Sequence, residues 1–214
     1  MANKNLNKIR ILLPVPIFIA ALFCEIAFAA VGCELNDPDR DIKRAFPQST
    51  GYRTDFVTIA ERGGEKLKIE IEKELGDKFD ALYESLDVPY TYYTVLKGKD
   101  VIGYMHGVNQ KGLYGGMQLI MATDPEGKII LFYYQKLSSS EAKALRDRSF
   151  TDRFTGLTLE DFNKSNESGS RISDIKDPTK NSHEDFLHTL RGLKKNIILL
   201  NEFILKGKKY EEKK

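Results

Sequence analysis

Apolar residues recur at helical spacing in two stretches of the chain. In residues 64–86, Lys and Glu separate the apolar positions Leu67, Ile71, Leu75, Phe79, Leu82 and Leu86. Residues 182–205 repeat the pattern with Phe186, Leu190, Leu193, Ile197, Leu200 and Ile204. The spacing predicts one or two amphipathic helices in the first stretch and a final helix, starting just after Thr179, in the second. Ser182, followed three residues later by Asp185, predicts a capping box at the start of this helix.

Between these stretches the pattern changes to runs of aromatic and β-branched residues. Four such runs occupy residues 90–98, 100–108, 112–124 and 127–137, and turn-forming residues separate them. They predict a four-stranded antiparallel meander. Gly115 and Gly116 lie inside the third run, which indicates a bulge or a point where another group approaches the backbone closely. The predicted fold class is therefore α+β: an antiparallel β-meander flanked by an N-terminal amphipathic helix and a C-terminal helix.

The N-terminal residues have the composition of an export signal. Lys4, Lys8 and Arg10 precede a long apolar run in which Glu25 is the one charged residue. We interpret residues 1–32 as a cleaved signal peptide of the lipoprotein type.

The residues 30–33, Ala-Val-Gly-Cys, resemble a bacterial lipobox, which implies that Cys33 is acylated. The alternative is an uncleaved anchor in which Cys33 stays unmodified. Either way we expect an extracytoplasmic, membrane-anchored protein of the cell envelope.

Charge and length indicate one domain without a global basic field. Residues 1–32 hold three of the 33 basic and one of the 31 acidic residues, so 30 of each sign remain in the mature chain. This balance argues against nucleic acid as a partner. We expect a polar tether over residues 33–44, a single domain over 45–208 and a charged tail over 209–214.

The polar residues give little sign of catalytic or metal chemistry. His106, His183 and His188 are the only histidines, and they lack the spacing of metal ligands. No nucleophile elbow or phosphate-binding loop is present in the sequence. We therefore predict no metal site and no catalytic residues.

The order of elements after Tyr90 resembles the FMN-binding domain family, whose members occur in the Rnf electron-transport complex and in the sodium-pumping NADH:quinone oxidoreductase. The resemblance covers roughly residues 90–188, and its better part is "VIGYMHGVNQKGLYGGMQLIMATDPEGKII", followed by "QKLSSSEAKAL" and "FTDRFTGL". In that family a Ser-Glu-Thr-Pro-Gly element lies near the flavin. Ser140 and Glu141 match its first two residues, whereas Ala142 and Lys143 replace the Thr and Pro.

The family also links FMN through its phosphate to the Thr of a motif close to Asp-Gly-x-Ser-Gly-Ala-Thr-x-Ser-Ser. On this resemblance Asp174 stands for the leading Asp, Thr179 for the flavin-bearing Thr and Ser182 for the last Ser. Lys180 would add a positive charge beside a phosphate at the start of the last helix. Asp177 and Pro178 take the place of Gly-Ala. For the flavin ring, Leu157 and the aromatic residues of the meander offer an apolar platform.

The resemblance implies an electron-transfer carrier, or a component of a redox complex, rather than a stand-alone enzyme. Membrane-associated redox proteins would be its partners, and the lipid anchor would hold it close to them. Three versions of this hypothesis are open: FMN linked covalently to Thr179, FMN held without a covalent link, and a flavin-free binding or structural lipoprotein that keeps the fold.

Overall fold

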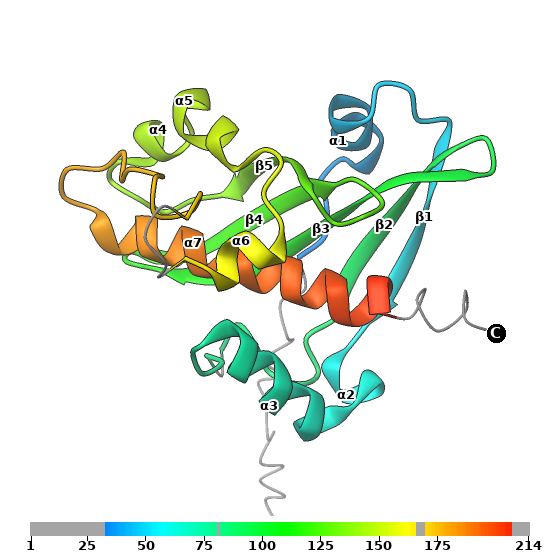
Figure 1. The fold of residues 1–214 in the computed structure, drawn as a ribbon, viewed down its shortest axis with the longest axis horizontal. Coiled ribbons are helices and arrows are strands. Elements are labelled where there is room, and N and C mark those ends of the chain that lie inside the picture. Colours follow the sequence, from blue (N-terminus) through cyan, green and yellow to red (C-terminus); the bar gives the residue numbers. More distant parts are fainter. Residues whose placement is uncertain (1–32, 81, 166–169, 207–214) are drawn as a thin grey trace, which may run out of the picture.

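A five-stranded antiparallel sheet organises the molecule (Figure 1). The computed structural model describes residues 33–80, 82–165 and 170–206. The strands follow one another in the order β1-β2-β3-β4-β5; they are β1 (Gly51–Val57), β2 (Tyr90–Lys97), β3 (Asp100–Gly112), β4 (Gly115–Thr123) and β5 (Ile129–Lys136). This arrangement confirms the predicted α+β class with a β-meander and a C-terminal helix.

Helices precede, flank and follow the meander. They are α1 (Pro38–Ala45), α2 (Ile59–Arg62), α3 (Gly64–Leu75), α4 (Ala142–Leu145), α5 (Arg148–Thr151), α6 (Leu159–Asn163) and α7 (His183–Leu200). A short 3-10 helix, η1 (Asp152–Phe154), extends α5, and a π-helical segment, η2 (Asn201–Leu205), continues α7. Helix α7 crosses one face of the sheet, with α3 beside it (Figure 1).

The predicted strands form, but the sheet contains a fifth that the sequence pattern did not reveal. Strand β1 pairs with β2 along all seven of its residues, from Gly51↔Leu96 to Val57↔Tyr90. It is an edge strand and most of its side chains are exposed. Because neither face of β1 is buried along its length, its sequence lacks the alternation that identifies a half-buried strand.

The third predicted run begins in a hairpin turn and continues as strand β4. Strands β3 and β4 stay in register up to the pair Gly112↔Gly115, so Leu113 and Tyr114 form a two-residue turn. The predicted bulge at Gly115 and Gly116 is absent from this pairing, so that reading was wrong. The alternative, a close approach to the backbone, holds at Gly116, where a Cβ would lie 3.1 Å from the Tyr83 ring. Gly115 follows this turn with φ +138°, a conformation that residues other than glycine rarely adopt.

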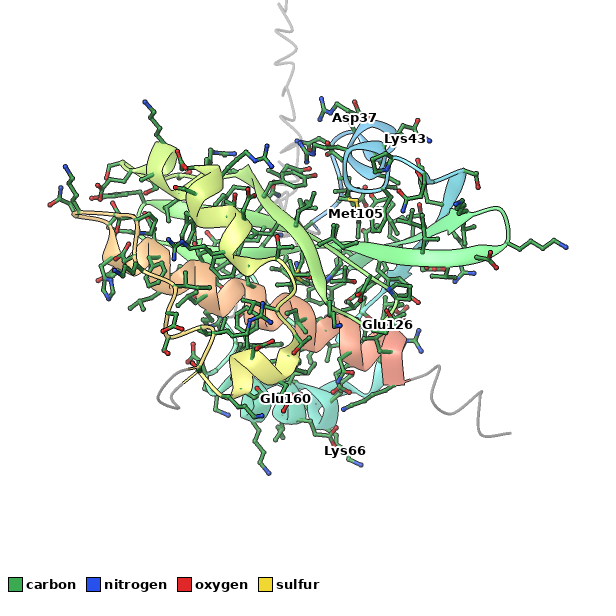
Figure 2. The ribbon with its side chains drawn as sticks, turned by 45° about the horizontal axis from the view of Figure 1, so that its top comes forward. Asp37, Lys43, Lys66, Met105, Glu126 and Glu160 are labelled. Carbon is green, nitrogen blue, oxygen red and sulfur yellow. The ribbon has the colours of Figure 1, made fainter. Side chains whose placement is uncertain are left out.

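Residues 33–44 belong to the fold instead of forming a tether. Asp37 caps helix α1 by accepting a hydrogen bond from Arg40 N–H, and Pro38 occupies the first turn. Leu35 and Ile42 are buried on the face of the sheet opposite α7. Met105 lies beneath α1 on that face (Figure 2). The domain thus includes Cys33 rather than beginning at residue 45, because α1 seals a second apolar core.

Helix α7 buries a polar stripe as well as an apolar one. Ser182, Asp185, Thr189, Gly192 and Asn196 are spaced by three or four residues, so they share one face. The four polar side chains are buried, and Leu119 packs against the backbone at Gly192. The predicted apolar positions of α7 are also buried or partly buried, so the helix is enclosed on more than one side.

Each polar side chain of this stripe has a partner from the sheet or its loops. Asp185 Oδ1 accepts the Leu113 N–H at 2.7 Å. Thr189 Oγ1 and Tyr134 Oη are 2.9 Å apart. Asn196 donates to the carbonyls of His106 and Leu119, at 3.2 and 3.3 Å. These bonds fix both the rotation and the register of α7 on the sheet, since a slip of one residue would leave buried polar groups unpaired.

A buried ionic cluster ties the segment after α3 to α7. Lys195 Nζ is hydrogen-bonded to Glu84 and donates to Asn109 O at 2.6 Å. Arg191 donates to both carboxylate oxygens of Glu84, at 2.8 and 3.0 Å. Burial alone would raise the pKa of Glu84, but Lys195 and Arg191 hold it below its ordinary value. Burial lowers the pKa of Lys195 to about 8, against the opposing effect of Glu84, so the pair is charged at neutral pH.

The packing of α1 predicts the effect of a methyl group at Gly103. A Cβ there would collide with the Thr123 carbonyl oxygen and lie 2.5 Å from the Phe46 ring, where φ is also +155°. We expect Gly103→Ala to lower the free energy of unfolding by about 1–3 kcal/mol. Gly51→Ala is the matched control, because nothing lies within 4 Å of its Cβ position. Equal denaturation midpoints for the two variants would contradict this packing.

His106 predicts a specific dependence of stability on pH. Asn196 Nδ2 is a donor, so its Oδ1 must accept from His106 Nδ1 at 2.8 Å. Burial lowers the pKa of His106 to about 3, whereas an unfolded histidine titrates near 6.5. Between these values the unfolded chain binds more protons, so stability falls as the pH decreases.

The contribution of His106 is about 1.4 kcal/mol per pH unit. His106→Gln can keep the hydrogen bond and does not titrate. Denaturant unfolding between pH 6.5 and 4 should therefore show a shallower slope for the variant, and identical slopes would exclude a neutral buried His106.

Candidate functional site

Three chain segments meet at the N-terminal end of α7. They are the β3–β4 turn, the loop after β5 that holds Ser138 to Glu141, and residues 177–185. Leu113 N–H bonds to Asp185 as described above, and Ser140 Oγ and Ser182 Oγ are 3.0 Å apart. A Cβ at Gly115 would contact Ser138 at 3.7 Å. We call these segments the α7 N-terminal cluster.

Glu141 supplies the anion at this helix start. Its carboxylate accepts the N–H of Lys180 at 2.9 and 3.0 Å and that of Asn181 at 2.6 Å. The hydrogen bonds from Asn181 and Lys180 hold the pKa of Glu141 below its ordinary value. Ser182 makes no side-chain cap at this end, so the predicted capping box was wrong. Asp185 faces Leu113 N–H instead, and Glu141 holds the two backbone N–H groups that lie just before the helix.

Thr179 is paired with Asp177. The Thr179 N–H and hydroxyl both donate to Asp177 Oδ1, at 2.8 and 2.7 Å. The other carboxylate oxygen of Asp177 lies 2.7 Å from His183 Nδ1. Burial would raise the pKa of Asp177, but its bonds with Thr179 and His183 lower it. Thr179 is half-buried and Lys180 is exposed.

The donors around Thr179 suit an anion, but the residues do not fit a phosphate ester on its hydroxyl. Glu141 already occupies the N–H groups of Lys180 and Asn181. An ester would break the bond between Thr179 and Asp177. A phosphate would then lie beside the carboxylates of both Asp177 and Glu141, and like charges at about 4 Å repel by roughly 1 kcal/mol in water and 4 near a protein surface.

Two other residues that the resemblance names as flavin-binding lie outside the α7 N-terminal cluster. Asp174 is exposed, and its N–H donates to the Ser170 carbonyl at 3.3 Å. Leu157 is buried in the core, where its carbonyl accepts the Ile129 N–H at 2.9 Å. Leu157 therefore offers no surface to a flavin ring. Tyr114 is one of the meander aromatics that the sequence offers as a platform, but sequence reasoning did not single it out or find Leu113. Both are exposed at the cluster, Leu113 by 38% and Tyr114 by 65%, and their position at the hairpin tip depends on the strand register.

The thiol of Cys33 is enclosed in the second core. Cys33 is 3% exposed, and its Sγ would lie 2.7 Å from a Cβ at Gly107. Burial raises its pKa to about 12. The next residues are also held, since Asn36 N–H donates to Gln135 Oε1 at 2.8 Å and Gln135 Nε2 to the Glu34 carbonyl at 2.7 Å. A diacylglyceryl group on Cys33 would require the thiol to leave this position, and its acylation stays a prediction.

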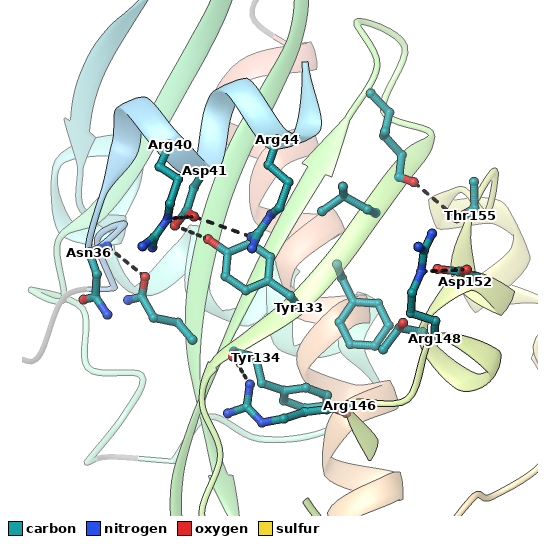
Figure 3. A pocket seen from close by; sticks show the side chains of 15 residues that line it. Asn36, Arg40, Asp41, Arg44, Tyr133, Tyr134, Arg146, Arg148, Asp152 and Thr155 are labelled. Atoms are coloured by element: carbon teal, nitrogen blue, oxygen red, sulfur yellow. Dashed lines mark hydrogen bonds and ion pairs between the residues drawn. The ribbon is translucent and has the colours of Figure 1, made fainter. Parts of the chain in front are cut away.

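An open pocket of about 970 Å³ lies along β5, between α1 and the α4–α5 segment (Figure 3). Polar, aromatic and aliphatic side chains line it, among them Arg40, Arg44, Arg146 and Arg148. Sequence analysis did not identify this pocket. The pairs Arg40/Arg44 and Arg146/Arg148 were visible signals, but they come from segments about a hundred residues apart.

Comparison with known proteins finds no family model that matches the chain and no curated protein that is significantly similar to it. Among the described residues, no group of three or more His, Cys, Asp and Glu side chains is placed to hold a metal ion. The helices of the described ranges are all too short or too polar to cross a bilayer. The apolar run of residues 1–32 lies outside these ranges, as do residues 207–214, which include the predicted tail.

The role of Glu141 predicts the exchange of two amide protons. Glu141→Ala removes the acceptor of Lys180 and Asn181, so hydrogen exchange at both amides should accelerate, whereas Glu141→Gln, which keeps a neutral acceptor, should have a smaller effect. Glu184→Ala is the control, because Glu184 is exposed in the first turn of the same helix. Equal acceleration in the alanine variant and the control would exclude Glu141 as the acceptor of these two amides.

Proposed function

We propose that the protein is an extracytoplasmic, membrane-anchored FMN-binding protein that carries electrons, and that the flavin is held without a bond to Thr179. One observation carries the proposal: Ser140 and Glu141 lie against Lys180–Ser182. Only the resemblance to the FMN-binding domain family suggested that these two elements, about 40 residues apart, form one site.

The surroundings of the cluster support an aromatic ligand there. Tyr114 and Leu113 leave apolar surface in solvent at the turn that contacts α7. A Tyr ring can stack on a flat heterocycle. When bound, a flavin would supply one- and two-electron transfer. The residues of the chain would orient the ring, while the exposed Lys180 offsets part of the charge of Asp177 and Glu141.

A carrier needs partners rather than a substrate of its own. Membrane-associated redox proteins are the partners that this proposal requires. An anchor in residues 1–33, as a lipid on Cys33 or as an uncleaved segment, would keep the domain near them. Whatever the anchor, the residues from Cys33 to α1 are held by the fold and do not act as a free linker.

The alternative is a flavin-free binding or structural lipoprotein. A specific observation favours it: the carboxylate of Glu141 already satisfies the amides that an anionic ligand would need. The two functions differ in whether purified protein contains or takes up FMN.

The test is the absorbance spectrum and intact mass of the protein exported by a host with a flavin transferase. We expect yellow protein of unmodified polypeptide mass that releases FMN on denaturation, and Thr179→Ala should stay yellow. One FMN of added mass that is lost in Thr179→Ala would contradict the non-covalent proposal. Colourless protein that takes up no FMN would favour the flavin-free alternative.

A second variant locates the flavin. Tyr114→Ala should weaken FMN binding by roughly 2- to 10-fold, because an aromatic stacking contact contributes about 0.5–1.5 kcal/mol beyond its buried area. Phe56→Ala is the matched control, as Phe56 is 61% exposed on β1. Fluorescence titration measures both affinities, and unchanged binding in Tyr114→Ala would remove the flavin from the α7 N-terminal cluster.

A further inference from the structure

We propose that the pocket along β5 binds the phosphate group of an organic phosphate ester. Arg40 and Arg44 reach it from α1, and Arg146 and Arg148 reach it from the α4–α5 segment (Figure 3). This site lies outside the α7 N-terminal cluster and does not depend on flavin binding.

The charges that line the pocket leave an excess of positive charge. Four guanidinium groups line the pocket with two carboxylates, those of Asp41 and Asp152, and Asp37 pairs with Arg40 at 3.7 Å from outside the lining. Asp41 is buried; it accepts the Tyr133 hydroxyl at 2.7 Å and Arg40 Nε at 3.2 Å, and lies 3.6 Å from Arg44 Nη2. Asp41 therefore orients Tyr133, Arg40 and Arg44 rather than facing a ligand. An excess of one positive charge remains, which suits an anionic ligand.

The other side of the pocket is arranged in a similar way. Arg146 Nη1 donates to the Tyr134 carbonyl at 2.5 Å, a contact that orients the guanidinium without neutralising it. Arg148 pairs with Asp152 at 3.5 Å in an exposed ion pair, which a bound anion can replace at little cost. A guanidinium has five N–H donors in a fixed fork that matches phosphate oxygens. The contacts with Asp41, Asp152 and the Tyr134 carbonyl use only a minority of the N–H donors of the four arginines.

The floor of the pocket is aromatic and apolar, which favours a ligand that also has an organic group. The Arg44 guanidinium lies 4.1 Å from the centre of the half-buried Tyr133 ring. Ile130 and Leu131 are half-buried on the same strand and add apolar surface. The volume of about 970 Å³ is in the range of small-molecule sites and far exceeds what an inorganic ion needs. A phosphate monoester with an apolar or flat substituent satisfies both halves of the pocket.

The position of the pocket allows two sources for this phosphate. Asn36 lines it and follows Cys33 by three residues, a span of at most about 11 Å of extended chain. A domain anchored through residues 1–33 would therefore hold the pocket close to the membrane, where lipid headgroups carry phosphate. A soluble phosphate ester of the envelope has the same chemistry.

The experiment is a calorimetric titration of the full exported protein with phenyl phosphate. Arg44→Gln and Arg146→Gln test the two sides of the pocket, and thermal melts check that each variant folds. Arg53→Gln is the matched control, since Arg53 is 68% exposed on β1 beside its own partner Asp55. Phenol, which lacks the phosphate, is the ligand control.

We expect saturable binding of phenyl phosphate that weakens with salt and falls at least about tenfold in each pocket variant, as for loss of a charge-assisted hydrogen bond. Arg53→Gln should bind like the wild type, and phenol should not bind detectably. Absence of binding to both phenyl phosphate and vesicles, or an equal loss in Arg53→Gln, would overturn the proposal. FMN is itself a phosphate monoester, so the Tyr114→Ala titration decides whether FMN binds at the α7 N-terminal cluster, whereas phenyl phosphate tests the pocket along β5 on its own.

Co-sedimentation with phosphatidylcholine vesicles, with and without phosphatidic acid, separates the two sources. Binding to the phosphatidic acid vesicles that Arg44→Gln and Arg146→Gln abolish assigns the site to a lipid headgroup. Binding of phenyl phosphate without any gain on those vesicles assigns it to a soluble ester. Vesicle binding that persists in both pocket variants would show that another surface holds the lipid and would count against the pocket.

Discussion

The fold depends on the polar contacts that seat α7 on the sheet. A helix that buried only apolar side chains could rotate or slide by a residue at modest cost. Helix α7 instead presents Asp185 to the β3–β4 turn, Thr189 to β5, and Asn196 to β3 and β4. Displacement would leave several buried polar groups without partners, each at a cost of about 1–3 kcal/mol. This requirement fixes where α7 begins, and therefore where the amides of Lys180 and Asn181 lie.

Both proposed sites follow from this placement. At the start of α7, the amides meet Glu141, and the β3–β4 turn brings Tyr114 into the same region. Strand β5 joins the two sites: Tyr134 bonds to Thr189 beneath α7, while Tyr133 lies under Arg44 on the side of α1. The protein thus has one end whose anion site is filled by its own carboxylate and one pocket whose guanidinium groups are open to a ligand.

The sequence predicted the parts of the fold that have a clear period. Four strands, the turns at Gly98 and Gly127, and the last helix follow from alternation, turn residues and helical spacing. Strand β1 and helix α1 could not be predicted in this way. An exposed edge strand lacks the alternation of apolar and polar residues, and a charged helix of eight residues resembles a linker. The buried polar stripe was hidden for a different reason: polar residues are expected at the surface, and only tertiary partners allow their burial. The motif resemblance named Glu141 and Ser182, which the fold brings together, whereas the arginine pocket joins segments that no local pattern connects.

A double-mutant cycle on His106 and Asn196 tests the central claim most directly, with His106→Phe, Asn196→Leu and the double variant compared by denaturant unfolding. If the polar stripe seats α7, each single change leaves a buried group unpaired and the double change removes both, so the coupling free energy should be about 1–3 kcal/mol. Additive effects within about 0.5 kcal/mol would contradict the account, because α7 would then be held by its apolar face alone.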